Sequence, residues 1–279
     1  MTKTPRKAIV ISASSDIGAE LCKKWRQDGW DICGTYRTPS PLVQELTNNY
    51  GIKMVKCDLL DKNSIRTACR QLKEGCLHWD VLVFAPGRQE PVGDFHHVSF
   101  DEWEEGVQVN LLAQLRILRD LLFLRNPDSN PEPCVLFFAG GGTNNAVVHY
   151  SSYTMCKIAL IKMCELLDAE IPDTRFVIVG PGWVKTKIHQ PTLEGGAKLA
   201  GDNYEKTIDK LKSNECTPMD KVIDCCDWVV NTPSKGVRGR NFSVVFDRWG
   251  SPDIERELEK NRDMYKLRRH GNDWKGRES

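Results

Sequence analysis

The sequence has no excess of charge of either sign, with 39 lysines and arginines against 38 aspartates and glutamates in 279 residues. A strongly basic or acidic chain would favour nucleic acid or an anionic membrane as its partner. Long hydrophobic runs are also missing, because no apolar stretch reaches the length that crosses a bilayer. Residues 1–7 lead into the first apolar stretch without the core of a signal peptide. We therefore expect a cytoplasmic protein that binds neither nucleic acid nor membrane and holds its ligand in a pocket.

Paired cysteines are missing as well. The eleven cysteines are scattered along the chain, mostly within predicted strands and helices, and none belongs to a Cys-x-x-Cys pair. Because zinc sites commonly use such pairs, the sequence predicts no metal site. Buried, reduced thiols are the expected form of these cysteines.

Glycine is scarce where a phosphate-binding turn would use it. An apolar run at 7–12 is followed by the segment 13–18 and an amphipathic helix, so we expect a strand, a tight turn and a helix. A dinucleotide pyrophosphate binds well at such a helix N-terminus. Only Gly18 is present, and Ser12 and Asp16 stand where glycine is more usual. We expect the Asp16 carboxylate to cap the helix, since it would otherwise repel a phosphate.

The rest of the chain alternates between short apolar runs and longer amphipathic stretches. The apolar runs predict strands at 31–36, 53–57, 80–87, 134–138, 176–183 and 240–246. The amphipathic stretches predict helices that start near 41 and at about 61–75, 100–125, 151–170 and 219–231. This alternation predicts an α/β fold, a doubly wound parallel sheet with helices on both faces.

The chain length suits a single domain, which we place at residues 1–250. Within it, the segment at about 188–218 lacks strand character and carries many charges, which suggests a mobile lid over a site. Residues 251–279 are highly charged, and we expect a solvated helix or a disordered tail without a chemical role.

Arg37 follows the predicted second strand, and no acidic residue stands with it. In a mononucleotide-binding half, the end of this strand faces the adenosine ribose. An acid there selects a free 2′-hydroxyl, whereas an arginine accommodates a 2′-phosphate. Arg37 therefore predicts that NADP(H) is preferred over NAD(H).

The chain is organised around a buried strand that ends in the glycines 140–142 and is followed by a long helix. Tyr153 and Lys157 stand one turn apart on that helix and so share one face. A tyrosine takes part in proton transfer near neutrality only if its pKa of about 10 falls by roughly three units. A lysine about 5 Å away would favour the phenolate by roughly 3 kcal/mol, nearly the whole requirement. The same spacing occurs by chance on many helices, so the surrounding motifs have to show whether this pair is catalytic.

Asn110 lies in the apolar middle of the predicted 100–125 helix, where a buried amide needs partners. It would either fix the helix against a neighbouring backbone or hold a water or a lysine. These two roles are compatible.

Together these residues make the chain resemble the short-chain dehydrogenase/reductase family over about residues 7 to 250. The landmarks follow the family's order and are Ser12 to Gly18 at the glycine turn, Asp58, Ala85-Pro86-Gly87, Asn110, Tyr153 with Lys157, and Pro181-Gly182 with Thr186. The resemblance implies a seven-stranded Rossmann-like sheet and a nicotinamide cofactor. It also implies a homodimer or homotetramer formed through the two long helices.

The resemblance further implies roles for single residues. Tyr153 would be the general acid/base, Lys157 would lower its pKa and hold the nicotinamide ribose, and Asn110 would carry a water in the proton relay. Val184 and Thr186 would meet the carboxamide. The residues expected around the cofactor are Ser12, Ser14, Ser15, Asp16, Ile17, Gly18, Arg37, Asp58, Leu59, Ala85, Pro86, Gly87, Tyr153, Lys157, Pro181, Gly182, Val184 and Thr186.

One landmark of the family is missing. Its carbonyl-polarising serine lies about thirteen residues before the tyrosine, and Gly140 stands there, so Thr143 is the candidate replacement. The leading hypothesis is an NADP(H)-dependent oxidoreductase that interconverts a carbonyl and a secondary alcohol. The alternatives are a reductase of a sugar or polysaccharide pathway and an inactive dinucleotide-binding or structural protein. The inactive reading rests on Gly140, Ser12 and Asp16.

Overall fold

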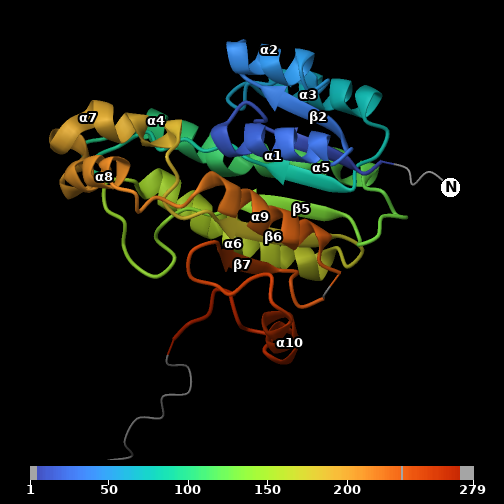
Figure 1. The fold of residues 1–279 in the computed structure, drawn as a ribbon. Coiled ribbons are helices and arrows are strands. Elements are labelled where there is room, and N and C mark those ends of the chain that lie inside the picture. Colours follow the sequence, from blue (N-terminus) through green and yellow to red (C-terminus); the bar gives the residue numbers. More distant parts are fainter. Residues whose placement is uncertain (1–4, 234, 271–279) are drawn as a thin grey trace, which may run out of the picture.

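The fold is a seven-stranded parallel sheet between two layers of helices (Figure 1). The computed structural model describes residues 5–233 and 235–270. The strands are β1 (Lys7–Ile11), β2 (Asp31–Tyr36), β3 (Lys53–Lys56), β4 (Val81–Phe84), β5 (Cys134–Phe138), β6 (Arg175–Gly180) and β7 (Arg240–Ser243). They lie in the order β3-β2-β1-β4-β5-β6-β7, and every neighbouring pair is parallel. The predicted α/β doubly wound class is confirmed.

Helices fill the connections between the strands. They are α1 (Asp16–Gln27), α2 (Pro41–Asn48), α3 (Lys62–Gly75), α4 (Phe100–Val107), α5 (Ala113–Leu121), α6 (Ser151–Glu170), α7 (Gln190–Ala200), α8 (Asp202–Lys212), α9 (Met219–Asn231) and α10 (Pro252–Lys260). Several begin with a Ser or Asp side chain that accepts a hydrogen bond from the first turn, which satisfies a backbone N–H that has no helical partner. These caps are Ser15, Ser40, Asp61, Ser99 and Ser251.

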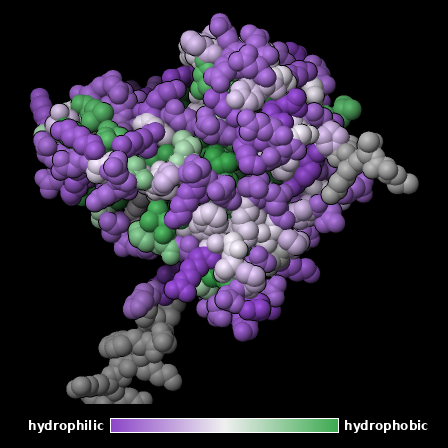
Figure 2. Space-filling view, viewed as in Figure 1, coloured by the Kyte–Doolittle hydropathy of each residue, from purple (hydrophilic) through white to green (hydrophobic). Residues whose placement is uncertain are grey.

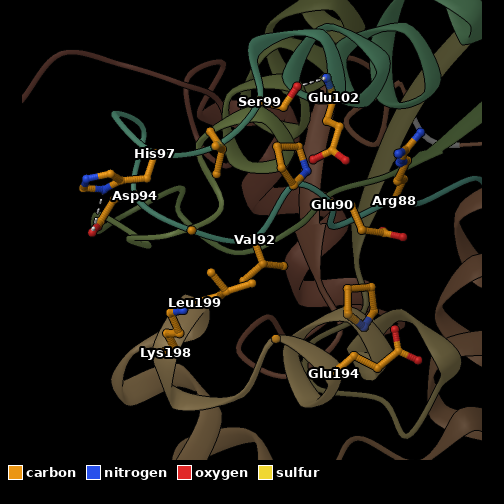
Figure 3. A pocket seen from close by; sticks show the side chains of 15 residues that line it. Arg88, Glu90, Val92, Asp94, His97, Ser99, Glu102, Glu194, Lys198 and Leu199 are labelled. Atoms are coloured by element: carbon orange, nitrogen blue, oxygen red, sulfur yellow. Dashed lines mark hydrogen bonds and ion pairs between the residues drawn. The ribbon is translucent and has the colours of Figure 1, made fainter.

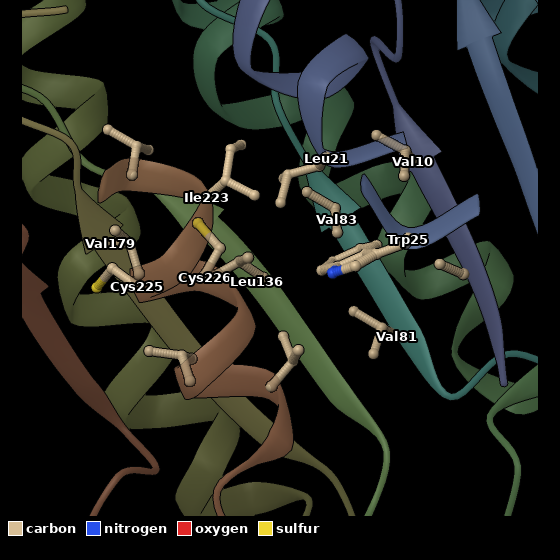
Figure 4. Close-up of a cluster of buried hydrophobic side chains, with 14 of the residues drawn as sticks. Val10, Leu21, Trp25, Val81, Val83, Leu136, Val179, Ile223, Cys225 and Cys226 are labelled. Atoms are coloured by element: carbon tan, nitrogen blue, oxygen red, sulfur yellow. The ribbon is translucent and has the colours of Figure 1, made fainter. Parts of the chain in front are cut away.

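Alternate residues of each central strand pack against opposite helical layers. Ala8 and Val10 of β1 belong to the core under α1 and α9, whereas Ile9 and Ile11 belong to the core under α3, α5 and α6. Figure 4 shows the first of these cores, with Trp25 of α1 and the α9 side chains over the sheet. Because the central strands are buried on both faces, their sequences are continuously apolar.

The strand order reverses at β1, which pairs with β2 on one side and with β4 on the other. The connections that follow β1 and β4 therefore diverge at the same edge of the sheet. In open α/β sheets, ligands bind in the crevice that such a reversal leaves beyond the carboxyl ends of the strands. The topology thus places the site before any side chain is considered.

The segment 188–218 is mostly regular, which differs from the sequence analysis. After a short 3₁₀ turn, η3 (Lys187–His189), it forms α7 and α8, which lie together at the left of Figure 1. Gly196 has a positive φ of 61° and interrupts α7. Adjacent glycines, here Gly195 and Gly196, usually indicate a loop, so the sequence did not predict these two helices.

The predicted helix 100–125 is a continuous rod of mixed type. Between α4 and α5 the chain makes a π-helical turn, η1 (Gln108–Leu112), and after α5 a 3₁₀ turn, η2 (Leu122–Leu124). Single π-helical turns occur frequently at functional sites. This one carries Asn110.

The charged tail is attached to the domain as far as the structure describes it. Helix α10 buries Ile254 and Leu258 in the first core. Arg240 donates hydrogen bonds to the carbonyls of Leu258 (2.6 Å) and Asn261 (3.1 Å), and the Asn241 N–H donates to the Tyr265 carbonyl (2.9 Å). Residues 252–260 thus form a helix, one of the two expected forms, but its apolar side packs on the core instead of being solvated all round. Residues 271–279 lie outside the described part.

Candidate active site

The turn after β1 closes with a single essential glycine. Ser12 has a φ of 61°, in the left-handed region that favours glycine. Its carbonyl accepts a hydrogen bond from the Ser15 N–H (2.9 Å), and its own N–H donates to Thr35 Oγ1 (2.8 Å). A Cβ at Gly18 would lie 2.6 Å from the Ser12 carbonyl oxygen, so no larger residue fits there. Ser12 thus forms the turn in a strained backbone conformation. A non-glycine residue in this region typically costs about 1 to 3 kcal/mol.

Asp16 does not cap α1, contrary to the prediction. The cap is Ser15, whose Oγ accepts a hydrogen bond from the Gly18 N–H at 3.2 Å. The Asp16 carboxylate accepts a hydrogen bond from the Lys187 N–H (2.9 Å), and the Lys187 ammonium lies 3.6 Å from it. This nearby cation offsets the charge that would otherwise repel a phosphate at the turn.

Arg37 is exposed at the carboxyl end of β2. Two of its expected neighbours, Asp58 and Leu59, follow β3. The Asp58 carboxylate accepts a hydrogen bond from the Leu60 N–H (3.0 Å), and the carbonyl of the buried Leu59 accepts one from Gln108 Nε2 (3.2 Å). These contacts hold the loop after β3 against the π-helical turn.

Asn110 is completely buried, and its amide pairs with the backbone of Arg88 in the loop after β4. The Asn110 side chain donates to the Arg88 carbonyl (2.8 Å) and accepts from the Arg88 N–H (3.0 Å). Its own carbonyl accepts a hydrogen bond from Gln114 Nε2 (2.8 Å). The structure therefore confirms that Asn110 fixes the helix against a neighbouring backbone. Its role in a proton relay stays a prediction.

Lys157 joins the ends of two strands. Only 2% of the residue is exposed, and Nζ donates to the carbonyls of Phe138 (3.0 Å) and Pro86 (3.3 Å). Phe138 ends β5, and Pro86 lies in the loop after β4. The ammonium also lies 5.6 Å from the centre of the Tyr153 ring. Tyr153 and Lys157 thus lie together near the carboxyl ends of the central strands, as their helical spacing predicts.

Burial disfavours the charged forms of both residues. It raises the pKa of Tyr153 to about 12 and lowers the pKa of Lys157 to about 8. The predicted lowering of the Tyr153 pKa is therefore wrong for this structure. The loss of water around the phenolate outweighs the attraction of the Lys157 ammonium. At neutral pH Tyr153 carries its proton.

A cavity of about 610 Å³ runs along these groups. In Figure 2, hydrophobic residues lie on the visible face between the α7–α8 pair at the left and the centre of the molecule. The predicted residues that line the cavity are Ser14, Ser15, Asp16, Ile17, Arg37, Ala85, Pro86, Gly87, Tyr153, Lys157, Pro181 and Thr186. The predicted residues that are not among those lining the cavity are Ser12, Gly18, Asp58, Leu59, Asn110, Thr143, Gly182 and Val184.

A second cavity, of about 830 Å³, adjoins the first between the loop after β4 and helix α7 (Figure 3). The two share Arg88, Glu90, Pro191 and Glu194. Figure 3 shows Glu90 and Glu102 on one side of the second cavity and Glu194 on the other. Its lining carries more carboxylates than basic groups, so it disfavours a multiply anionic ligand.

Sequence reasoning missed the polar groups that connect α7 to the site. Thr192 of α7 donates a hydrogen bond to Gln89 Oε1 (3.1 Å), and its hydroxyl also lies 2.8 Å from that of Tyr150. Arg88 pairs with Glu105 at 2.7 Å. No motif predicts these contacts. Thr192 meets Gln89 only when α7 packs over the loop after β4, and Arg88 meets Glu105 only when that loop packs against α4.

Comparison with known proteins places the chain in a family. The model of the short chain dehydrogenases matches residues 6–196. The protein therefore belongs to the short-chain dehydrogenase/reductase family of oxidoreductases. It is 26% identical over 233 residues to the "uncharacterized oxidoreductase YvrD" of Bacillus subtilis, which covers 80% of this chain and 86% of that protein.

Solved structures show the same fold. The KRED1-Pglu enzyme superposes with a TM-score of 0.75 at 21% identity, over 85% of this chain and 99% of that one. A variant of actinorhodin polyketide ketoreductase, solved with NADPH, gives a TM-score of 0.75 at 20% identity, over 86% and 95% of the two chains. The family's fold binds a nicotinamide dinucleotide.

The residues present fit such a cofactor. The first cavity extends from the N-terminus of α1, at Ser14 and Ser15, to Tyr153 and Lys157. A helix N-terminus suits a pyrophosphate, and Arg37 adds a cation to the lining. Among the described residues, no group of three His, Cys, Asp or Glu side chains is placed to hold a metal ion, and no helix is long and apolar enough to cross a membrane.

Proposed function

We propose that this protein is an NADP(H)-dependent oxidoreductase that interconverts a carbonyl and a secondary alcohol. One observation supports this most: a single cavity is lined by the N-terminus of α1, by Arg37, and by Tyr153 with Lys157. A dinucleotide in that cavity would have its phosphates at the helix end and its reactive ring near the tyrosine. When bound, it supplies or accepts the hydride.

Tyr153 is the proton donor in this proposal. Because its pKa is raised, its hydroxyl is protonated at neutral pH and donates to the carbonyl oxygen of the substrate during reduction. Lys157 is held by the Phe138 and Pro86 carbonyls, and its ammonium stabilises the negative charge that the tyrosine acquires. Asn110 keeps the loop after β4 in place through Arg88.

The second cavity is where we propose that the carbonyl or alcohol substrate binds. It continues from the first and is bounded by α7, which makes the 188–218 segment a lid over the substrate. The contact of Thr192 with Gln89 would fasten that lid. The carboxylates of the lining favour a neutral or cationic substrate over one with several negative charges.

We further propose a homodimer or homotetramer paired through the α4–α5 rod and α6. Several large apolar side chains of these elements are exposed, which a pairing face would cover. They are Phe100, Leu112, Phe123, Met155 and Leu166. A cytoplasmic location stays a prediction that the buried cysteines support.

Tyr153→Phe tests the chemical step. NADPH alone should raise the melting temperature of both the native protein and this variant, because the removed hydroxyl is assigned to the proton and not to binding. NADPH oxidation with a panel of ketones and aldehydes should be lost in Tyr153→Phe, and Tyr50→Phe, outside both cavities, should match the native protein. Turnover in Tyr153→Phe would remove this residue from the mechanism.

The second candidate function is a binding protein without catalysis. Gly140 favours it, because it leaves the carbonyl without the usual serine hydroxyl. A native protein that binds NADPH but oxidises it with no member of the panel would support this reading. Absence of NADPH binding would contradict both candidates.

A further inference from the structure

Gly140 directly follows Ala139 at the end of β5, and the side chain of Tyr153 lies against it. A Cβ built on Gly140 would be 2.7 Å from Tyr153 Cε1, 2.9 Å from the Tyr153 hydroxyl oxygen and 3.0 Å from Lys157 Cγ. Real Cβ atoms essentially never approach other heavy atoms below 3.0 Å, so the tyrosine occupies the room of the missing side chain.

Tyr153 is packed on one side and open on the other. It is half-buried against the cluster of Val92, Tyr150 and Ala200, and its other side lines the first cavity, so a new side chain at position 140 would push the ring toward that cavity. Lys157 is held by two carbonyl acceptors, so the third close contact of the Cβ is with an anchored side chain. A side chain at position 140 would therefore displace Tyr153 by a distance comparable to the overlap.

We infer that Gly140 is a positioning residue: its lack of a side chain allows the Tyr153 hydroxyl to reach the end of β5. The catalytic role of Gly140 rests on the proposed function, whereas the close contact with Tyr153 is independent of it. On this inference the site requires glycine at position 140. Restoring a serine at position 140 should lower turnover, because the serine and the tyrosine compete for one place.

The neighbouring glycine gives a matched control. A Cβ on Gly141 would meet only Val147 Cγ2, at an ordinary 3.6 Å, and its φ is not in the left-handed region. Gly142 is not suitable, since its φ is 99°. Gly140→Ala and Gly140→Ser should therefore be compared with Gly141→Ala.

The first readout needs no substrate. Gly140→Ala should lower the melting temperature, and Gly141→Ala should leave it nearly unchanged. In a Tyr153→Ala background the clash is relieved, so adding Gly140→Ala should then cost less than it does in the native protein. Equal losses in the two backgrounds, or no loss at all in Gly140→Ala, would overturn the inference.

The second readout is kinetic and applies if the native protein turns over. A displacement of about 1 Å in a reacting group can cost roughly a hundredfold in rate, so Gly140→Ser and Gly140→Ala should lower kcat by about ten- to a hundredfold. The KM for NADPH should change less than kcat, because the phosphate turn and Arg37 lie elsewhere in the cavity and only Lys157 is shared. A rise of kcat in Gly140→Ser would overturn the inference. If no carbonyl is reduced by the native protein, the proposed function fails while the melting-temperature cycle still decides this inference.

Discussion

The two halves of the site differ in how closely they follow their motifs. Around β1 and β2, the predicted groups Ser14, Ser15 and Arg37 line one cavity, although Asp16 bonds to Lys187 instead of capping α1. Around β5 and α6, Gly140 takes part in packing, the pKa of Tyr153 moves upward, and Thr143 does not line the cavity.

The contrast has a physical origin. A phosphate turn is made mainly of backbone, and its form follows from chain geometry that serine can adopt with some strain. The catalytic half depends on distances between side chains from different elements and on how much water reaches them, which set its pKa values. A sequence motif therefore predicts a phosphate turn better than it predicts the distances and pKa values of a catalytic site.

The largest effect expected in the cofactor half is that of Arg37→Ala. The guanidinium should contribute a charge-assisted contact to a 2′-phosphate worth roughly 1.5 to 3 kcal/mol, or about 10- to 150-fold in affinity. NADPH should bind more tightly than NADH to the native protein, and the variant should bind both alike. Arg37→Lys, which keeps the charge, should retain part of the preference. Tighter binding of NADH to the native protein would contradict the assignment.

In the catalytic half, Lys157 should couple stability to pH. Its pKa is about 8 in the folded protein and near its ordinary 10.5 when unfolded, so between pH 8 and 10 the unfolded chain binds more protons. Stability therefore rises with pH in this window, by about 2 kcal/mol for this one group. Chemical denaturation of the native protein and of Lys157→Met should show the native protein gaining by that amount relative to the variant. A pH-independent difference would mean that Lys157 is not desolvated.

The smallest effect is expected from Thr143→Val. If Thr143 replaced the missing serine, removing its hydroxyl should cost at least about tenfold in turnover, since a single oxyanion donor is typically worth about a hundredfold or more. Because Thr143 lies outside the lining of both cavities, we now expect a loss below about threefold in kcat. Thr143→Ser serves as the conservative control. A tenfold loss in the valine variant with normal activity in the serine variant would return Thr143 to the catalytic half.

The sequence by itself determined the class of fold, because continuously apolar runs alternating with amphipathic stretches leave few arrangements other than a parallel sheet covered on both faces. It also located the turn after β1, Arg37, and the pair Tyr153 and Lys157. These features depend on neighbours within a few residues, and helical periodicity alone brings the tyrosine and the lysine to one face.

Tertiary structure decided what those residues meet. The partner of Asp16 is Lys187, far along the chain, and α7 comes to line the cavities only when it packs against the loop after β4. The charged tail folds back because Arg240 finds backbone carbonyls in it. Gly140 also depends on tertiary structure, because the ring that fills the space beside it belongs to Tyr153 on α6. Contacts between distant segments and the exclusion of water arise only in the folded chain, so no local pattern encodes them.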